Sequence, residues 1–325
     1  MSTEMTLVEA VRDGLHREME RDDDVVVLGE DVGDNGGVFR ATEGLIDEYG
    51  ADRVVDTPLS ESGIVGASVG LAAAGVRPVA EIQFMGFAYP ALDQIFSHVA
   101  RMRTRTRGDY TLPLVVRMPY GGGIKAPEHH SESTEAFFAH YPGLKLVVPS
   151  TPYDARGMLA SAIRSDDPVV VLEPKRVYRA FREEVPDESH EVAIGDARVV
   201  TEGDDVTVYT WGSMVHQVLD AAEDVDFDVC VVDLRTLSPL DRDTIEETFL
   251  RSGRACVVHE APRTAGFGAE VVATVQERAL GYQEAPVVRV TGFDVPYPLY
   301  RLEKYYLPSV ERIRDGIRQA AEFRF

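Results

Sequence analysis

Glu61 is an acidic side chain at the start of a segment that is otherwise too apolar to face water. From Gly63 to Gly75 the chain carries no charge and almost no large side chain, and a helix that is apolar all round is usually buried. Burial disfavours the charged carboxylate and raises its pKa. A carboxyl group held in this way could share a proton with a ring nitrogen. The alternative is that Glu61 only complements the positive end of the helix dipole.

The residues next to Glu61 in the sequence predict the strand and the helix that flank it. A strand over residues 53–57 is predicted to end before Pro58, because the residue before a proline is pushed out of the helical region. Ser60 is expected to cap the following helix, since its hydroxyl can accept a hydrogen bond from a free amide of the first turn. The small residues of this helix would let another backbone or a flat ligand come close.

A glycine-rich stretch, Gly121 to Gly123, follows a predicted strand over 112–118 and leads to His129 and His130. An imidazole titrates near neutral pH, so it can bind an anion or transfer a proton. A lone histidine on such a loop would more often be solvated.

Glu30 and Asp31 directly follow another apolar strand, predicted over 25–29. Open α/β folds bind ligands at the carboxyl ends of their strands, so either acid could face a site. A plain turn is at least as common an explanation for either residue alone.

Alternation of strands and helices predicts an α/β fold with two doubly wound domains, over residues 1–185 and 186–325. The acidic stretch 182–191 is predicted to link them. Predicted strands are 25–29, 53–57, 78–84, 112–118, 144–148 and 169–172, then 206–210, 229–232, 255–258 and 287–290. Predicted helices are 6–20, 42–49, 60–75, 89–107 and 152–164, then 214–222, 241–250, 267–280 and 309–322.

Composition argues against several partners. The net charge of −22 argues against nucleic acid and anionic membranes. No apolar run approaches the roughly 20 residues of a membrane span. Residues 1–21 contain no apolar signal segment, so a cytoplasmic protein is expected. Cys230 and Cys256 lie in apolar runs and are expected to be small buried hydrophobic residues.

Only four of the 33 basic residues are lysines, so arginine carries most of the positive charge. An acid-rich, lysine-poor surface is typical of a halophilic protein, since high salt screens its self-repulsion. Stability that increases with potassium chloride would support this hypothesis. Four arginines between 101 and 107 are expected at the surface or in a subunit contact, because a spacing of two spreads them around a helix.

Over essentially its whole length, the sequence resembles the β subunit of the thiamine-diphosphate-dependent 2-oxoacid dehydrogenase complexes, of the pyruvate and branched-chain types. The motifs that carry the resemblance follow one another in order along the chain. They are LGEDVG (28–33), DTPLSESGIVG (56–66), RPVAEIQFMGFAYPALDQI (77–95), HHSESTEAFFAHYPGLKLVVPSTPYDARG (129–157), DDPVVVLEPKRVYRA (166–180), VVDLRTLSPLD (231–241) and HEAPRTAGFGAE (259–270).

The resemblance implies a transketolase-like pyrimidine-binding domain followed by a transketolase C-terminal domain. It implies that Glu61 hydrogen-bonds the pyrimidine ring of thiamine diphosphate and that Phe87 stacks on this ring. Leu59 and Gln83 match positions that line the same pocket, and Glu30 is a further candidate cofactor-binding residue. His130 matches a histidine at the active-site mouth, where it would bind the substrate carboxylate or assist acyl transfer to a lipoyl group.

The same resemblance implies that this chain holds only half of the active site. It contains no Gly-Asp-Gly, its single asparagine is Asn35, and no phosphate-binding loop or dinucleotide-type glycine motif is present. The diphosphate and its Mg²⁺ would therefore be bound by an α subunit, in a heterotetramer of two α and two β chains. A lipoyl acyltransferase core would be the next partner.

Family β subunits often hold a structural potassium ion, mainly through backbone carbonyls. The matching positions are Leu114, Ala162, Ile163, Ser165 and Asp167. Ser165 and Asp167 depart from the acid and the amide often found there.

The substrate and the exact activity stay open. The stretches EIQF, EPKRVYRA and HEAP look nearer the branched-chain type, but pyruvate is not excluded. One alternative is the C-terminal half of a split transketolase or of a deoxyxylulose-phosphate synthase. The other is a noncatalytic scaffold subunit that has kept the fold.

Overall fold

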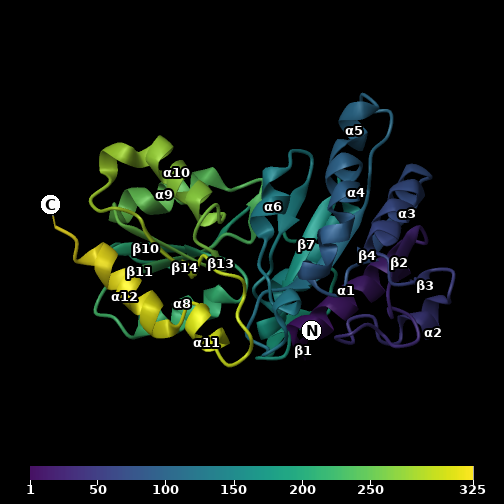
Figure 1. Ribbon diagram of the computed structural model, residues 1–325, viewed down its shortest axis with the longest axis horizontal. Coiled ribbons are helices and arrows are strands. Elements are labelled where there is room, and N and C mark those ends of the chain that lie inside the picture. The colour runs from purple at the N-terminus through teal and green to yellow at the C-terminus, as the bar shows by residue number, and fades with distance from the viewer. Residues whose placement is uncertain (325) are drawn as a thin grey trace.

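The computed structural model describes residues 1–324 and consists of two α/β halves that lie side by side, each with a central sheet (Figure 1). The first sheet has seven strands, and all neighbouring strands run parallel except at one edge. In spatial order they are β12 (Thr236–Ser238), β6 (Lys145–Val147), β7 (Val169–Pro174), β5 (Val115–Tyr120), β4 (Arg77–Glu81), β2 (Val25–Gly29) and β3 (Val54–Asp56).

The second sheet has five strands, with an antiparallel strand at one edge. Its order is β14 (Val288–Gly292), β13 (Ala255–Pro262), β10 (Val206–Thr210), β11 (Val229–Asp233) and β9 (Arg198–Thr201). A separate antiparallel pair joins β1 (Ser2–Met5) to β8 (Glu183–Pro186). The expected α/β class with two mainly parallel sheets is confirmed. Part of the predicted linker is strand β8.

Helices cover both sheets, as apolar strands buried on two faces require. The helices are α1 (Leu7–Arg21), α2 (Leu45–Tyr49), α3 (Glu61–Ala73), α4 (Leu92–Ser97), α5 (Met102–Arg105), α6 (Glu135–His140), α7 (Pro152–Arg164), α8 (Met214–Glu223), α9 (Arg242–Ser252), α10 (Gly268–Ala279), α11 (Glu303–Tyr306) and α12 (Val310–Ala321). Short 3₁₀ turns are η1 (Met85–Ala91), η2 (Val99–Arg101), η3 (Glu128–His130), η4 (Lys175–Val177) and η5 (Leu280–Tyr282).

Two helix predictions were wrong. The expected long helix over 89–107 is divided into η1, α4, η2 and α5. Pro90 lies inside η1, where its ring removes a backbone donor, and the chain breaks again at His98. The helix expected over 42–49 begins only at Leu45, because Gly44 has a left-handed backbone conformation with φ of +84°.

The two halves share one apolar core. Tyr120 and Phe138 of the first half belong to the same buried cluster as Trp211, Leu237 and Phe267 of the second. Strand β12 strengthens this connection, because it adds residues of the second half to the edge of the first sheet. Cys230 and Cys256 are buried and unpaired, as expected. Among residues 1–324, no helix has the length and apolar character needed to cross a bilayer.

Candidate active site

Glu61 is the first residue of α3, as the sequence predicts. The Ser60 hydroxyl accepts a hydrogen bond from the Gly63 amide at 3.3 Å, which caps the helix. The Glu61 side chain is only half-buried, and no donor among residues 1–324 hydrogen-bonds its carboxylate. The prediction that α3 is buried all round was wrong for the single chain, since Ala67 and Gly70 are exposed. Glu61 therefore lies at an open surface.

Glu30, which follows β2, lies close to Glu61, which begins the helix after the edge strand β3. Burial raises the pKa of the Glu30 carboxyl, and the charges of Asp31 and Glu61 raise it further. The Gln83 side-chain amide donates to the Glu30 carbonyl at 3.4 Å and to the Asp31 carboxylate at 3.3 Å. Three of the predicted residues are thus gathered in one place. Leu59, two residues before Glu61 in the sequence, has 72% of its surface exposed.

Phe87 and His130 are also brought together. Their ring centroids lie 4.9 Å apart, and Phe84 packs against both, at 5.3 Å from Phe87 and 4.5 Å from His130. This approach requires Gly86, since a Cβ there would stand 2.0 Å from the His129 carbonyl oxygen. The structure therefore assembles an aromatic surface from η1 and η3.

The surroundings of the His130 imidazole favour its neutral form. Its Nδ1 atom is buried without a hydrogen-bond partner. Burial lowers the pKa of His130, the charges of Lys175 and His129 lower it further, and only Glu128 opposes them. A neutral imidazole with a free ring nitrogen can accept a proton or bind a polar group of a ligand.

The sequence analysis missed acidic residues of the second half that hold the glycine loop, defined here as Gly121 to Gly123. Glu260 accepts a hydrogen bond from the Gly122 amide at 2.8 Å. Glu303 accepts from the Gly123 amide at 2.9 Å. Glu260 lies in the motif HEAP, but nothing local in the sequence indicates its contact with the glycine loop. The second half thus positions a loop that leads to His130.

A buried ionic network lies in the first sheet beneath these loops. Arg117 on β5 donates to Glu173 on β7 through two bonds of 2.7 Å and also pairs with Glu81 on β4. The Tyr178 hydroxyl donates to Glu173. All four side chains are almost fully buried. The network therefore fixes three neighbouring strands next to the ends that carry the candidate residues.

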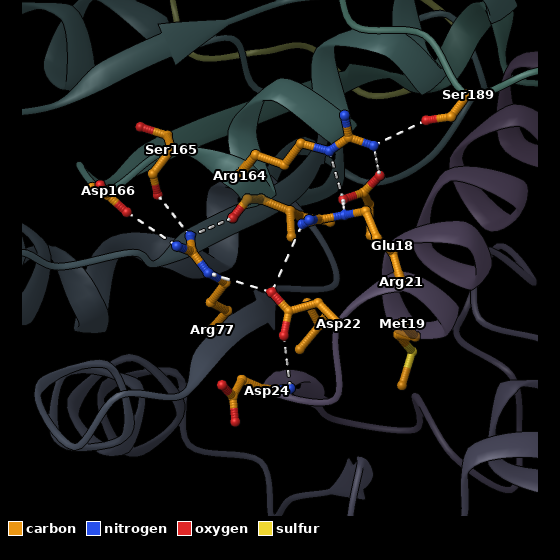
Figure 2. A network of polar contacts seen from close by, with 12 residues as sticks. Glu18, Met19, Arg21, Asp22, Asp24, Arg77, Arg164, Ser165, Asp166 and Ser189 are labelled. Atoms are coloured by element: carbon orange, nitrogen blue, oxygen red, sulfur yellow. Dashed lines mark hydrogen bonds and ion pairs between the residues drawn. The ribbon is translucent and has the colours of Figure 1, made fainter.

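Two of the carbonyl groups predicted to hold potassium, those of Ile163 and Ser165, already accept hydrogen bonds from a protein cation. The Arg77 guanidinium donates to the Ile163 carbonyl at 3.0 Å and to the Ser165 carbonyl at 3.3 Å, and it pairs with Asp166 at 3.0 Å. Figure 2 shows Arg77 pointing at this loop, next to the ion pair between Arg164 and Glu18. The Leu114 and Ala162 carbonyls accept backbone hydrogen bonds from Val169 and Ser165.

Further positive charge surrounds Asp167. Arg103 pairs with it at 3.0 Å, and the Lys145 ammonium lies 3.8 Å from its carboxylate and donates to the Ser165 hydroxyl at 3.0 Å. Arg77, Arg103 and Lys145 already pair with the aspartates that could balance the charge of another cation. Because the Ile163 and Ser165 carbonyls already accept hydrogen bonds from Arg77, the residues in this arrangement do not fit a bound potassium ion.

Glu135 supplies a pH-dependent prediction. Its carboxyl is fully buried, and burial, with a contribution from the Glu260 charge, raises its pKa to about 7 against the opposing effects of its own backbone amide and of Trp211. Because this folded-state pKa exceeds the unfolded value, stability is lost as pH rises toward 7. We expect Glu135→Gln to become more stable relative to the wild type by about 3 kcal/mol between pH 4.5 and 7. Urea unfolding at several pH values measures this, and parallel pH profiles for the two proteins would contradict it.

The chain matches two families of transketolase domains. Residues 3–180 match the family described as the transketolase pyrimidine-binding domain, and residues 195–313 match the transketolase C-terminal domain. The proteins named pyruvate dehydrogenase E1 component subunit beta from Acholeplasma laidlawii and from Bacillus subtilis (strain 168) are each 50% identical over 323 residues. These matches cover 98% of this chain and 99% of each relative.

A solved structure described as a split gene transketolase, an inactive beta4 tetramer, superposes with a TM-score of 0.80. The match covers 98% of both chains at 22% sequence identity. At this identity the likeness establishes the fold alone.

Proposed function

The chain belongs to the family of pyruvate dehydrogenase E1 β subunits, and from this premise we propose that it forms half of the active site of a thiamine-diphosphate-dependent 2-oxoacid decarboxylase. The family membership confirms the resemblance drawn from the sequence motifs. The observation that carries the proposal is the placement of Glu61, an unpaired carboxyl at an open helix start, within one site that also contains Glu30 and Gln83.

These residues fit the aminopyrimidine end of thiamine diphosphate. Glu61 would hold a proton at a ring nitrogen, and the raised pKa of its neighbour Glu30 favours a shared proton at this site. Phe87 offers an aromatic face for the flat ring, with Gln83 and Leu59 at its border. When bound, thiamine diphosphate supplies the carbon nucleophile that attacks the 2-oxo group and takes up the electrons left by decarboxylation.

His130 would act on the substrate side of the same site. Its neutral ring and free Nδ1 suit hydrogen bonding to the substrate and acceptance of a proton. The aromatic contacts with Phe84 and Phe87 hold the imidazole in place. We propose that it positions the substrate carboxylate or assists transfer of the acyl group to a lipoyl group on an acyltransferase core.

The diphosphate and Mg²⁺ are assigned to an α subunit. Among residues 1–324 no group of three or more His, Cys, Asp or Glu side chains is arranged to hold a metal ion. The open face of α3 and the exposed Leu59 side chain offer apolar surface for a second chain beside Glu61. We propose that two α and two β chains assemble into the active enzyme.

Pyruvate is the proposed substrate, because the similar E1 β subunits bear that name. A branched-chain 2-oxo acid is the alternative favoured by some motifs. The test is decarboxylation of a panel of both acid types by this chain assembled with the α chain encoded beside it. Highest kcat/KM with pyruvate is expected, and turnover of only branched-chain acids would replace this substrate assignment.

A salt experiment tests the halophilic hypothesis and potassium binding together. The net charge of −22 implies self-repulsion that salt screens, so the free energy of unfolding should increase as chloride salt is raised. Arg77 and Lys145 already hydrogen-bond groups of the predicted potassium site. Potassium and sodium should therefore stabilise the protein equally at the same ionic strength. Full stability at low salt would contradict the first expectation, and a specific gain with potassium would contradict the second.

A further inference from the structure

Lys175 is a buried lysine at the start of η4, directly after strand β7. Only 4% of its surface is exposed, and burying an ammonium group is costly unless it is well paired. Its ammonium donates a hydrogen bond to the Gly121 carbonyl in the glycine loop. The side chain therefore joins the end of β7 to the loop that leads to His130.

Two acids from the second half face Lys175 and oppose the cost of its burial. They are Glu260 on β13 and Glu303 on α11, whose charges both favour the protonated ammonium. The same two carboxylates accept the Gly122 and Gly123 amides. Lys175, the glycine loop and the second half thus form one polar assembly.

The polar assembly is also connected to His130, through the Phe84 ring. The Lys175 Nζ atom lies 5.8 Å from the centroid of the Phe84 ring, within the range of a cation–π contact. Phe84 in turn packs against the His130 ring with 4.5 Å between centroids. The other charged groups that act on His130 are His129 and Glu128, both in the same turn η3.

We propose that Lys175 is a positioning residue, whose buried ammonium fixes the glycine loop against the second half and maintains His130 as a neutral imidazole next to Phe87. The relevance of His130 to catalysis rests on the proposed function. The contact between Lys175 and the His130 surroundings does not.

The sign of the effect follows from the two titrations. Burial lowers the pKa of Lys175 to about 7, although Glu260 and Glu303 oppose this. His130 gains its proton below its ordinary value of 6.5, where Lys175 is mainly charged. Like charges disfavour each other's ionisation. A neutral residue at position 175 should therefore raise the pKa of His130, whereas arginine should keep it low.

The experiment measures deuterium exchange at the imidazole C2 carbon across pH 5 to 9, followed by mass spectrometry with fragment ions that separate His130 from His129. It uses the assembled complex of this chain with its α chain and needs no substrate. The variants are Lys175→Met and Lys175→Arg. Lys304→Met removes an exposed lysine of the same charge and serves as the matched control.

We expect the pKa of His130 to rise by about 1 unit in Lys175→Met, to stay near the wild-type value in Lys175→Arg, and to be unchanged in Lys304→Met. Should Lys175→Met fail to assemble, Lys175→Gln gives the same neutral comparison with a donor for the Gly121 carbonyl. An unchanged His130 pKa in a folded neutral variant would overturn the inference.

Activity is read separately on the same samples. A shifted His130 pKa together with a shifted pH profile of kcat supports both the positioning role and the proposed function. A shifted His130 pKa in a complex that decarboxylates no 2-oxo acid would support the positioning role and contradict the proposed function.

Discussion

Glu61→Gln should lower the rate of 2-oxo acid decarboxylation by the assembled enzyme at least about 100-fold, the lower range for loss of a proton-transferring group. Glutamine keeps the size of the side chain but cannot hold or release the proton that the pyrimidine ring nitrogen requires. The carboxylate accepts no hydrogen bond within residues 1–324, so no fold-stabilising contact is lost. Assembly and thermal stability should therefore remain unchanged.

The rate is measured with pyruvate and an artificial electron acceptor, which removes any need for the acyltransferase core. Glu20→Gln, at an exposed position of α1, controls for loss of one negative charge. A Glu61→Gln enzyme as active as the control would favour the alternative of a noncatalytic scaffold subunit. It would also contradict the catalytic role proposed for Glu61.

Arg117→Met should reduce the free energy of unfolding by about 3–5 kcal/mol, the range found when one partner of a buried ion pair is removed. Arg117 bonds Glu173 twice at 2.7 Å and also pairs with Glu81, and all three are buried. Methionine fills much of the space but leaves two carboxylates buried without their cation. Urea unfolding of the wild type and the variant measures the loss.

Two further variants test whether the unpaired buried carboxylates cause this loss of stability. Arg242→Met breaks an ion pair with Glu270 whose side chains are about half exposed, so it should change stability little. Adding Glu81→Gln and Glu173→Gln to Arg117→Met should recover part of the loss, because no unpaired charge then remains. The explanation fails if Arg117→Met costs no more than Arg242→Met, or if the triple variant recovers nothing.

The sequence was informative about the strands because parallel strands covered on both faces are short apolar runs. Strands such as 25–29 and 206–210 were predicted with the bounds that the structure has. Strand β12 was not predicted, since its pairing with β6 joins residues about 90 positions apart and leaves no local pattern. One long helix was predicted over 89–107, but Pro90 and the break at His98 divide it.

The site residues divide in the same way: some are indicated by nearby sequence, and others only by contacts between distant parts of the chain. Glu61 and Ser60 were predicted from the change between strand, proline and apolar helix, and Phe87 and His130 from family motifs. Lys175, Glu260 and Glu303 were missed as site residues. Their hydrogen bonds to the glycine loop join residues 54 to 180 positions apart. The complete burial expected for α3 was wrong because a single chain leaves one side of this helix open.

The most direct test is to measure thiamine diphosphate binding and pyruvate decarboxylation with this chain alone and then with its α chain. The half-site account predicts tight binding and turnover only when both chains are present, because no Gly-Asp-Gly diphosphate motif exists in this sequence. Tight binding and turnover by this chain alone would contradict the account.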